Sequence, residues 1–372
     1  MKIILAPDSF KGSLTSDEFI KIASDVIKEK LPAAEIVPFW MADGGEGSLQ
    51  ALSHELPLKF YSLKVKNPLG RRSNASFAMD KENAYVEMAS ASGLLKMRKN
   101  KPQGFISTSY GTGELIKAAL DRGAKTIYLC LGGSGTVDGG SGAMKALGAY
   151  FKDSAGHQVL GSAKNLSRIA TIDLNNFDSR IKDVHFISLA DVINPLCGDN
   201  GAVKVFGPQK GLSPEQLEIV EKGMEHYAEV LKKTFHVDLQ SLVSGGAAGG
   251  MGTALSLFCS AEVTSGADMI LKLGHFEEKC QNADYIFTGE GKLDASSFQG
   301  KAISRLVEFG QKHHVRTVAF VGTVENITPE ENGLYRIIAL KRPEMTTDYS
   351  IKHAKTLLEK AIEKFILEVK KD

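Results

Sequence analysis

Short apolar runs alternate with amphipathic segments at the start of the chain. The pattern predicts a strand over 2–6, a helix over 15–31, a strand over 35–40 and a further helix after Gly47. The helix over 15–31 has a defined start, because Thr15 and Glu18 can form a capping box in which each side chain binds the backbone amide of the other residue. Strands that alternate with helices are typical of βαβ units, so this region predicts a parallel sheet.

The same alternation returns near the end of the chain. Strands are predicted over 285–288, 317–321 and 336–340, and helices over 301–313 and 350–369. The central region follows a different pattern. Segments 58–65, 75–79 and 84–88 alternate apolar and polar residues as antiparallel strands do, and the turn signal Asn67-Pro68-Leu69-Gly70 lies among them. Farther along, a capping box of Ser213 with Gln216 begins a long amphipathic helix.

These patterns predict an α/β protein with two domains. One is a Rossmann-like domain with a parallel sheet, formed by 1–62 plus 285–372, and the other is an inserted α/β domain with a mixed sheet, formed by 63–284. The length of 372 residues agrees with this division, because single hydrophobic cores stop growing beyond about 250–300 residues. We expect the active site in the cleft between the two domains.

Composition excludes several classes of partner. The formal net charge of +1 gives no overall field that would attract nucleic acid or anionic lipid. No apolar run approaches the roughly 20 residues of a membrane span, and the apolar run before Pro7 is too short for a secretory signal, so we expect a cytoplasmic protein. The four cysteines lie far apart, as expected for reduced thiols.

The distribution of glycine is the first indication of a ligand site. The 37 glycines gather in clusters at 41–48, 110–115, 131–142, 206–211, 245–252 and 288–294, which we expect to be loops after strands. Glycine loops at helix starts can bind phosphate through backbone amides, although a single cluster can also be a simple tight turn. Most of these clusters also contain an acid or a lysine, and that combination suits a site for Mg²⁺ and a nucleotide.

The common nucleotide fingerprints are absent. No GxxxxGK[ST] motif occurs, because Gly300-Lys301 is followed by Ala302 and Gly291-Lys292 by Leu293. The loop after the first strand has one glycine, so a dinucleotide-dependent oxidoreductase is poorly supported. The motifs of protein kinases are missing as well.

Eight motifs in order carry a resemblance to a known family. They are APDSFKGS from residue 6, MADGGEG from 41, YGTGEL from 110, GGSGTVDGG from 132, DVINPLCG from 191, FGPQKG from 206, GGAAGG from 245 and GEGKLD from 289. In this the chain resembles the type I family of bacterial glycerate kinases, from residue 3 to about 325. The resemblance implies an enzyme that phosphorylates D-glycerate with ATP and Mg²⁺, with 2-phosphoglycerate as the usual bacterial product.

Two positions depart from the family pattern. Val137 stands where the family usually has an asparagine, which puts one polar contact in doubt. Ser296 stands where the family often has a glutamine, and its shorter side chain can form hydrogen bonds only with nearer groups.

Phosphoryl transfer to an alcohol requires charge neutralisation, positioning and a carboxylate that accepts the hydroxyl proton. We predict that Asp8, Ser9 and Lys11, on the loop before the capped helix, line the glycerate carboxylate or the path of the phosphoryl group. Asp8 and Lys11 are the predicted catalytic residues of this loop, and Ser9 is predicted to bind substrate. Asp191 follows an apolar strand and is the leading candidate for the base or a metal ligand, with helix or turn capping as the alternative.

The remaining candidates fall into three groups. Asp43, Glu290 and Asp294 are the predicted metal ligands, with turn capping as the alternative for each. Asp43 and Arg71 are also predicted to bind substrate, although Arg71 with Arg72 can equally be a solvated pair. The residues predicted to bind the nucleotide are Gly132, Gly133, Ser134, Gly135, Thr136, Lys210, Gly289, Gly291 and Lys292.

Other readings of the sequence stay open. A kinase of another small hydroxy acid fits the same residue chemistry, because only the family resemblance selects glycerate. A non-catalytic protein that binds a small acid would also explain a cleft between two domains. For the assembly, a homodimer is the hypothesis.

Overall fold

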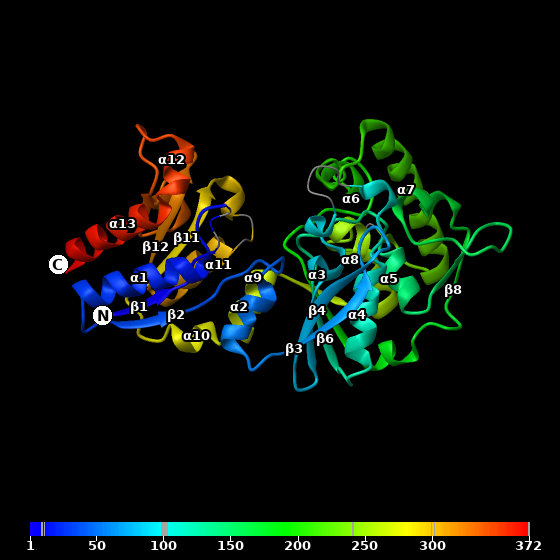
Figure 1. Cartoon of the computed structure of the whole chain (residues 1–372), viewed down its shortest axis with the longest axis horizontal. Helices are drawn as coiled ribbons and strands as arrows, with labels where there is room; N and C mark the ends of the chain where they lie inside the picture. Colours follow the sequence, from blue (N-terminus) through cyan, green and yellow to red (C-terminus); the bar gives the residue numbers. More distant parts are fainter. Residues whose placement is uncertain are drawn as a thin grey trace. The chain divides into compact units, whose positions relative to one another are not determined.

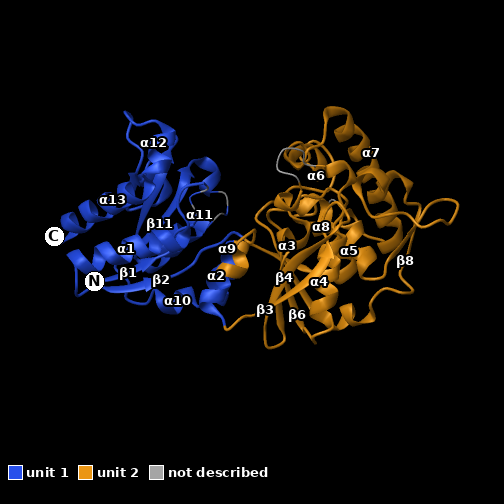
Figure 2. Ribbon diagram, viewed as in Figure 1, with its two compact units in different colours: residues 1–43, 51–56, 267–372 blue, residues 44–50, 57–266 orange. Residues whose placement is uncertain are grey.

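The computed structural model of the chain describes residues 1–8, 10, 12–97, 103–239, 242–298, 300 and 302–370 (Figure 1). They form two compact units (Figure 2). Unit 1 contains residues 1–43, 51–56 and 267–372, and unit 2 contains residues 44–50 and 57–266. The domain boundaries inferred from the sequence stay a prediction. In the described part of the chain, no helix has both the length and the apolar character that crossing a bilayer requires.

Unit 1 is an α/β unit built around a parallel sheet. Its strands are β1 (Lys2–Leu5), β2 (Glu35–Pro38), β11 (Tyr285–Leu293), β12 (Arg316–Val324) and β13 (Arg336–Ala339). Its helices are α1 (Ser16–Lys30), α10 (Phe276–Lys279), α11 (Ala302–His313), α12 (Thr347–Lys352) and α13 (Ala354–Val369), and the chain crosses between the units in α2 (Ser48–Glu55) and α9 (Gly266–Leu273).

The strand order β13-β12-β11-β1-β2 contains a reversal of direction across the sheet. From β1 the chain moves outward to β2, and from β11 it moves outward the other way through β12 to β13. The neighbours β1 and β11 pair in parallel, with Ile4 opposite Ile286. The topological switch point therefore lies between β1 and β11, and ligands of open α/β sheets bind at the carboxyl ends of such strands.

Both faces of this sheet are covered. In β12, Val318 and Phe320 pack with α1 and α13 in one core cluster, whereas Ala319 and Val321 pack with α11 in another. Successive residues of a strand point to opposite faces, so the apolar run of β12 supplies two cores. The capping box predicted at Thr15 is present, with Glu18 N donating to Thr15 Oγ1 at 3.1 Å.

Unit 2 contains a mixed sheet. The strands of unit 2 are β3 (Lys59–Lys66), β4 (Arg72–Asp80), β5 (Asn83–Glu87), β6 (Thr126–Cys130), β7 (Tyr150–Lys152), β8 (Thr171–Asp173), β9 (His185–Leu189) and β10 (Glu262–Thr264). Of these, β7 and β8 form a separate two-stranded sheet. The helices of unit 2 are α3 (Met88–Ser92), α4 (Tyr110–Leu120), α5 (Ser141–Ala146), α6 (Ala202–Phe206), α7 (Pro214–Phe235) and α8 (Ala247–Cys259).

The main sheet of unit 2 has the order β10-β9-β6-β5-β4-β3. β3, β4 and β5 form the antiparallel part that the sequence predicts, and β5, β6, β9 and β10 are parallel. The α7 capping box between Ser213 and Gln216 is present as predicted. A parallel sheet in one unit and a mixed sheet in the other confirm the predicted fold class.

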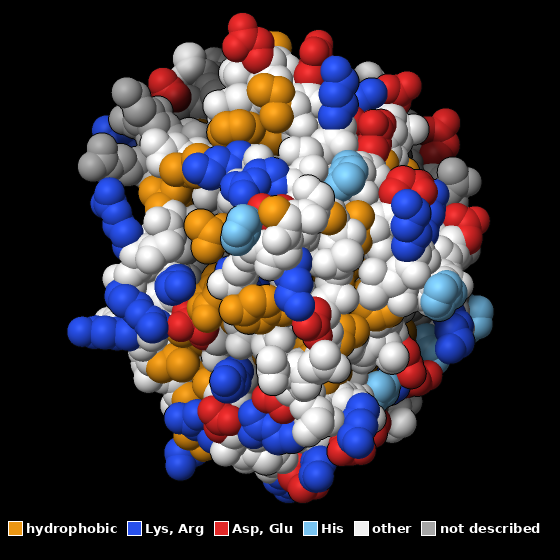
Figure 3. Space-filling view, turned by 90° about the vertical axis from the view of Figure 1, so that its right-hand side faces the viewer, with side chains coloured by type: hydrophobic (Ala, Val, Ile, Leu, Met, Phe, Trp, Pro, Cys, Tyr) orange, Lys and Arg blue, Asp and Glu red, His pale blue; other side chains and the backbone are white. Residues whose placement is uncertain are grey.

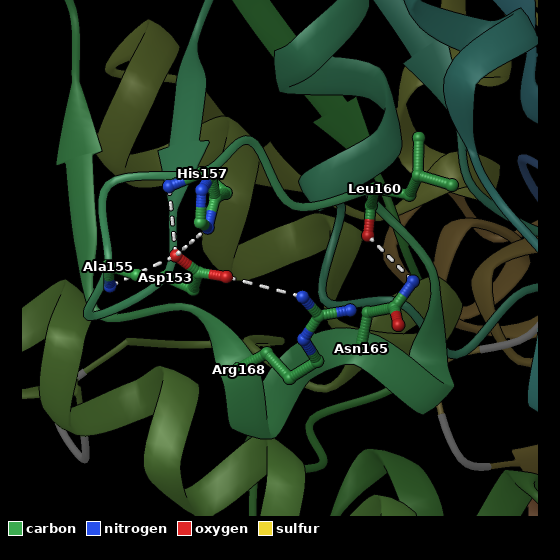
Figure 4. Close-up of polar contacts among 6 residues, drawn as sticks. All are labelled: Asp153, Ala155, His157, Leu160, Asn165 and Arg168. Atoms are coloured by element: carbon green, nitrogen blue, oxygen red, sulfur yellow. Dashed lines mark hydrogen bonds and ion pairs between the residues drawn. The ribbon is translucent and has the colours of Figure 1, made fainter.

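The connection between β7 and β8 is organised by one carboxylate (Figure 4). Asp153 accepts hydrogen bonds from the amides of His157 and Ala155 at 2.9 and 3.1 Å, and from the Arg168 guanidinium at 3.2 Å. The His157 amide, with Arg168, holds the pKa of Asp153 below its usual range.

The face shown in Figure 3 carries basic and acidic side chains interspersed, in keeping with the net charge of +1.

Two glycine clusters are not the loops that the sequence predicts. Gly111 and Gly113 lie inside α4, where a Cβ would come within 1.9 Å of the Lys66 carbonyl oxygen and 2.3 Å of the Ala143 carbonyl oxygen. Gly289 and Gly291 lie inside β11, which continues to Leu293 because its partner β12 is equally long. In these places glycine permits close packing of backbone rather than a turn.

Candidate active site

A cavity of about 390 Å³ lies at the carboxyl edge of the unit 1 sheet. Its lining residues are Asp8, Phe10, Ser13, Asp43, Glu290, Gly291, Lys292, Asp294, Ser296, Gly322, Thr323, Leu340, Thr347, Ser350, Ile351 and Ala354. Of the predicted site residues, Asp8, Asp43, Glu290, Gly291, Lys292 and Asp294 are brought together here. Ser9 and Lys11 fall outside the described residues.

The switch point of the sheet places two of these carboxylates. Asp8 follows β1, and its amide donates a hydrogen bond of 2.9 Å to the carbonyl of Gly289 on β11. Glu290 is the next residue of β11. A Cβ on Gly289 would lie 2.2 Å from the Phe320 carbonyl oxygen, so this glycine supports the strand pairing beneath the cavity.

Lys292 and Asp294 form a charged pair at the end of β11. The Lys292 ammonium lies 3.3 Å from Asp294 Oδ2 and also pairs with Glu325. Glu325 and then Asp294 raise the pKa of Lys292. The Ser296 hydroxyl, 2.7 Å from Asp294 Oδ1, and then Lys292 lower the pKa of Asp294. At neutral pH the ammonium and the carboxylate are both charged, and Ser296 makes a hydrogen bond of its own to Asp294.

The carboxylates that line the cavity are suitable ligands for a hard cation such as Mg²⁺. Carboxylate oxygens are the protein ligands that Mg²⁺ prefers, and the cavity is lined by Asp8, Asp43, Glu290 and Asp294. Within the described ranges, no group of three or more His, Cys, Asp or Glu side chains is arranged to hold a metal ion. Mg²⁺ usually takes one or two carboxylates and completes its shell with waters and phosphates, so the predicted ligands stay a prediction.

In unit 2, the predicted nucleotide loop 132–136 is tied to its surroundings by backbone hydrogen bonds. The amides of Gly132 and Gly135 donate to the carbonyls of Gly44 and Ser92 at 3.2 and 2.9 Å. The Gly133 carbonyl accepts from the Leu94 amide at 3.0 Å. Two amides of the loop therefore already have protein acceptors in this conformation.

Lys210 is buried beneath the same loop. Its ammonium donates to Ser134 Oγ at 3.0 Å and to the Thr136 carbonyl at 2.9 Å, and its residue is 3% exposed. Burial lowers the pKa of Lys210 to about 7, and nearby Asp138 opposes that shift. Its predicted contact with phosphate stays a prediction, but two of its three donors are occupied by the loop.

Asp138 is the buried anchor of the following turn. Its carboxylate accepts from the Ser109 amide and hydroxyl at 2.7 and 2.8 Å, and from the amides of Gly142 and Gly140 at 3.2 and 3.3 Å. Burial raises the pKa of Asp138, and these hydrogen bonds oppose the increase. Neighbouring Val137 is fully buried, so this family departure contributes apolar packing.

Asp191 and Arg71 lie elsewhere in unit 2. Asp191 follows β9, and its Oδ1 accepts a hydrogen bond of 2.9 Å from the amide of Gly266, the first residue of α9. This is the capping contact that the sequence offered as the alternative to catalysis. Arg71 is exposed in the turn after Asn67, whose Oδ1 accepts from the Arg71 amide at 2.9 Å. The catalytic and substrate roles of both residues stay predictions.

Several residues beside these sites carry no signal that the sequence motifs provide. Glu87 ends β5 and lines a second cavity of about 240 Å³ in unit 2, together with Glu46 and Lys96. It accepts from the Leu49 amide at 2.8 Å, and burial raises its pKa. A carboxylate at the last position of a buried strand was the available signal. Thr347 and Ser350 line the unit 1 cavity from α12, although the sequence predicts a helix only from residue 350 onward and no site there.

The fold and the cavity define an α/β protein that carries carboxylates and a lysine, the charged groups that phosphoryl transfer uses, at the carboxyl edge of a parallel sheet. The sequence model of the glycerate kinase family matches residues 3–370. The chain is 39% identical to glycerate 2-kinase of Escherichia coli K12 over 326 residues, which cover 87% of this chain and 86% of that protein.

Two further relatives indicate the same family. Identity to glycerate kinase of Bacillus subtilis 168 is 36% over 338 residues, 90% of this chain and 88% of that protein. The crystal structure of a protein provisionally named glycerate kinase 2 from Salmonella typhimurium LT2 superimposes with a TM-score of 0.86 at 34% identity, covering 100% of this chain and 98% of that one. The chain therefore belongs to the glycerate kinase family, as its motifs predict.

Proposed function

We propose that this chain transfers the terminal phosphoryl group of ATP to the 2-hydroxyl of D-glycerate, giving ADP and 2-phosphoglycerate. The observation that carries the proposal is the unit 1 cavity, because it gathers six of the predicted site residues of a glycerate kinase family member at a topological switch point. The relative at 39% identity is a glycerate 2-kinase, which supports the 2-hydroxyl as acceptor.

The reaction needs positioned charge more than covalent chemistry. Lys292 is a charged donor for phosphate oxygens, and the pairing with Asp294 and Glu325 keeps it protonated at neutral pH. A carboxylate must accept the proton of the glycerate hydroxyl as the new O–P bond forms. Asp8 at the switch point and Asp191 in unit 2 are the proposed candidates for this base.

The proposed cofactor is Mg²⁺, with Asp43, Glu290 and Asp294 as the residues that would hold it. Bound beside the phosphates, the ion supplies positive charge that neutralises the transferring group. The acidic lining of the cavity fits such a cation. A homodimer remains a hypothesis for the assembly.

A coupled kinase assay tests the function. Purified protein is incubated with Mg-ATP and D-glycerate, and ³¹P NMR identifies the product. Formation of 2-phosphoglycerate is expected, with L-glycerate, tartronate and glycerol as poorer acceptors. Turnover with another acid but none with D-glycerate would retain the kinase and reject the substrate. Binding of the acid without any phosphoryl transfer would support a binding protein instead.

Single variants test the base. Asp8→Asn and Asp191→Asn are compared at saturating ATP, Mg²⁺ and D-glycerate. The variant that removes the base is expected to lose turnover by about 10²–10⁴-fold, the usual contribution of general base catalysis. Near-normal turnover in both variants would reject both assignments. Asp121→Asn, an exposed carboxylate outside both cavities, is the control.

A further inference from the structure

The unit 1 cavity, called the groove below, is lined by residues from all five strand positions of the sheet. Thr323 and Glu290 lie in the C-terminal parts of β12 and β11. Leu340, Asp8 and Asp43 lie in the segments that follow β13, β1 and β2. Adjacent strands lie about 4.8 Å apart, so the four intervals of this sheet span about 19 Å. A volume of about 390 Å³ lies within the usual range for pockets of drug-sized ligands, about 300–1,000 Å³. A three-carbon acid fills only part of it.

The two ends of the groove differ in chemistry. The end at β11, β1 and β2 carries the carboxylates and Lys292. At the other end, the described lining residues from β13, α12 and α13 are all uncharged, and they are Leu340, Thr347, Ser350, Ile351 and Ala354. We call this end the α12 compartment.

The α12 compartment has an apolar floor and an accessible wall. Leu340 and Ala354 are 5% and 6% exposed, and both belong to the core cluster beneath the sheet face. Ile351 is 43% exposed although it is a large aliphatic residue, so it can cover a ligand without moving core atoms. Thr347 and Ser350 add hydroxyls, which can donate and accept hydrogen bonds.

This distribution matches the parts of a nucleotide. A nucleobase has flat apolar faces and polar edges, a ribose has hydroxyls, and the phosphates require cations and metal. Taking ATP as the phosphoryl donor from the proposed function, we infer that the α12 compartment binds the base and ribose of ATP, with the phosphates toward Lys292 at the switch point. Ile351, Thr347 and Ser350 are then nucleotide-binding residues, and unit 1 carries the nucleoside site.

The loop geometry in unit 2 agrees with this assignment. The amides of Gly132 and Gly135 donate to backbone carbonyls, and Lys210 is buried under the loop. Because these donors have protein acceptors, they are not available to the phosphates of a nucleotide in this conformation.

The test uses Ile351→Glu, which places a negative charge and a polar wall in the compartment. ADP binding is measured by titration calorimetry without any acid present. We expect ADP affinity to fall about tenfold or more, because a lost apolar contact in a pocket is worth about 10–200-fold. Inhibition by inorganic tripolyphosphate, which has no base, is expected to change less than threefold, and KM for D-glycerate is expected to stay the same.

Matched variants separate a local effect from misfolding. Ile219→Glu makes the same change at an exposed position of α7, 52% exposed and outside the cavity, and should bind ADP normally. Ile351→Ala keeps the surface uncharged and is expected to weaken ADP by a smaller factor. Equal ADP affinity in the wild type and Ile351→Glu would overturn the inference, as would a change confined to KM for glycerate.

The experiments distinguish failure of the proposed kinase function from failure of the inferred nucleotide site. A wild-type protein that transfers no phosphate to any acid would reject the kinase reaction. The calorimetric titration with ADP needs no turnover, so the loss of ADP binding in Ile351→Glu would support the nucleotide site even then. If the wild type binds no ADP while it phosphorylates glycerate from another donor, the inference fails and the kinase class survives.

Discussion

The ammonium of Lys210 donates a hydrogen bond of 2.9 Å to the carbonyl oxygen of Thr136, a residue 74 positions earlier in the chain. The same ammonium reaches Ser134, so one buried lysine fixes two residues of the glycine-rich loop. Lysine is costly to bury in its charged form, because it leaves water for a few fixed acceptors. The contact therefore links the geometry of the loop to the protonation of one side chain.

We predict that this lysine makes stability depend on pH. Burial lowers the pKa of Lys210 to about 7, against 10.5 for the lysine model value. Between these values the unfolded chain binds the proton and the folded chain does not, so stability rises with pH. The cost of the buried charge is complete below pH 7 and is relieved as pH increases toward 10.5. From pH 7 to 9 the free energy of unfolding should increase by about 2 kcal/mol relative to Lys210→Met.

Urea titrations at several pH values measure this difference. The comparison with Lys210→Met removes the contributions of all other titrating groups. Parallel stability profiles for the two proteins would show that the lysine has the same pKa folded and unfolded.

Gly249 is expected to tolerate no side chain. Its φ is +70°, and a Cβ there would lie 2.1 Å from the carbonyl oxygen of Thr136. Gly156 has a φ of +82° and open space around its Cβ position. We expect Gly156→Ala to lose about 1 kcal/mol from backbone strain alone, and Gly249→Ala to lose about 3 kcal/mol or more because the clash is added. Circular dichroism in urea measures both, and equal losses would mean that the backbone relaxes freely at Gly249.

Asp138 should be a stability residue as well as a member of a family motif. Replacing it with asparagine presents an NH₂ group to donors that now meet a carboxylate, at Ser109, Gly140 and Gly142. We expect Asp138→Asn to lose about 3 kcal/mol in urea denaturation, because buried hydrogen bonds to a charged group are lost and donors are left without acceptors. Asp199→Asn, on an exposed pair with Lys204, is the control and should unfold like the wild type. A stable Asp138→Asn protein would show that the site accepts an amide.

Removal of metal should stop turnover reversibly. Excess EDTA is expected to abolish phosphoryl transfer, and added Mg²⁺ to restore it. Glu290→Gln should raise the Mg²⁺ concentration for half-maximal rate about tenfold, since a ligand carboxylate becomes a neutral amide. Glu330→Gln, an exposed carboxylate outside the cavity, is the control. An unchanged Mg²⁺ requirement in Glu290→Gln would remove this residue from the metal site.

Local signals in the sequence were enough for most of the elements and for the family. The capping boxes at Thr15 and Ser213 depend on residues three positions apart, so they are readable without any tertiary contact. Alternation of strands and helices predicts the parallel sheet, and an antiparallel pattern predicts the mixed one. Asp8, Glu290 and Lys292 were candidates because each follows or ends a strand.

Only the tertiary structure decided what the glycines and the lysine do. Position 111, inside α4, requires glycine because a Cβ there would lie 1.9 Å from the Lys66 carbonyl oxygen, and the sequence carries no mark of that neighbour. Lys210 is buried under a loop that is distant in sequence, whereas composition alone places lysines at the surface. The strand order brings Asp8 beside Glu290 and places α12 over the far end of the same groove. Sequence patterns determine which elements form, but contacts between residues far apart along the chain determine which side chains share a site.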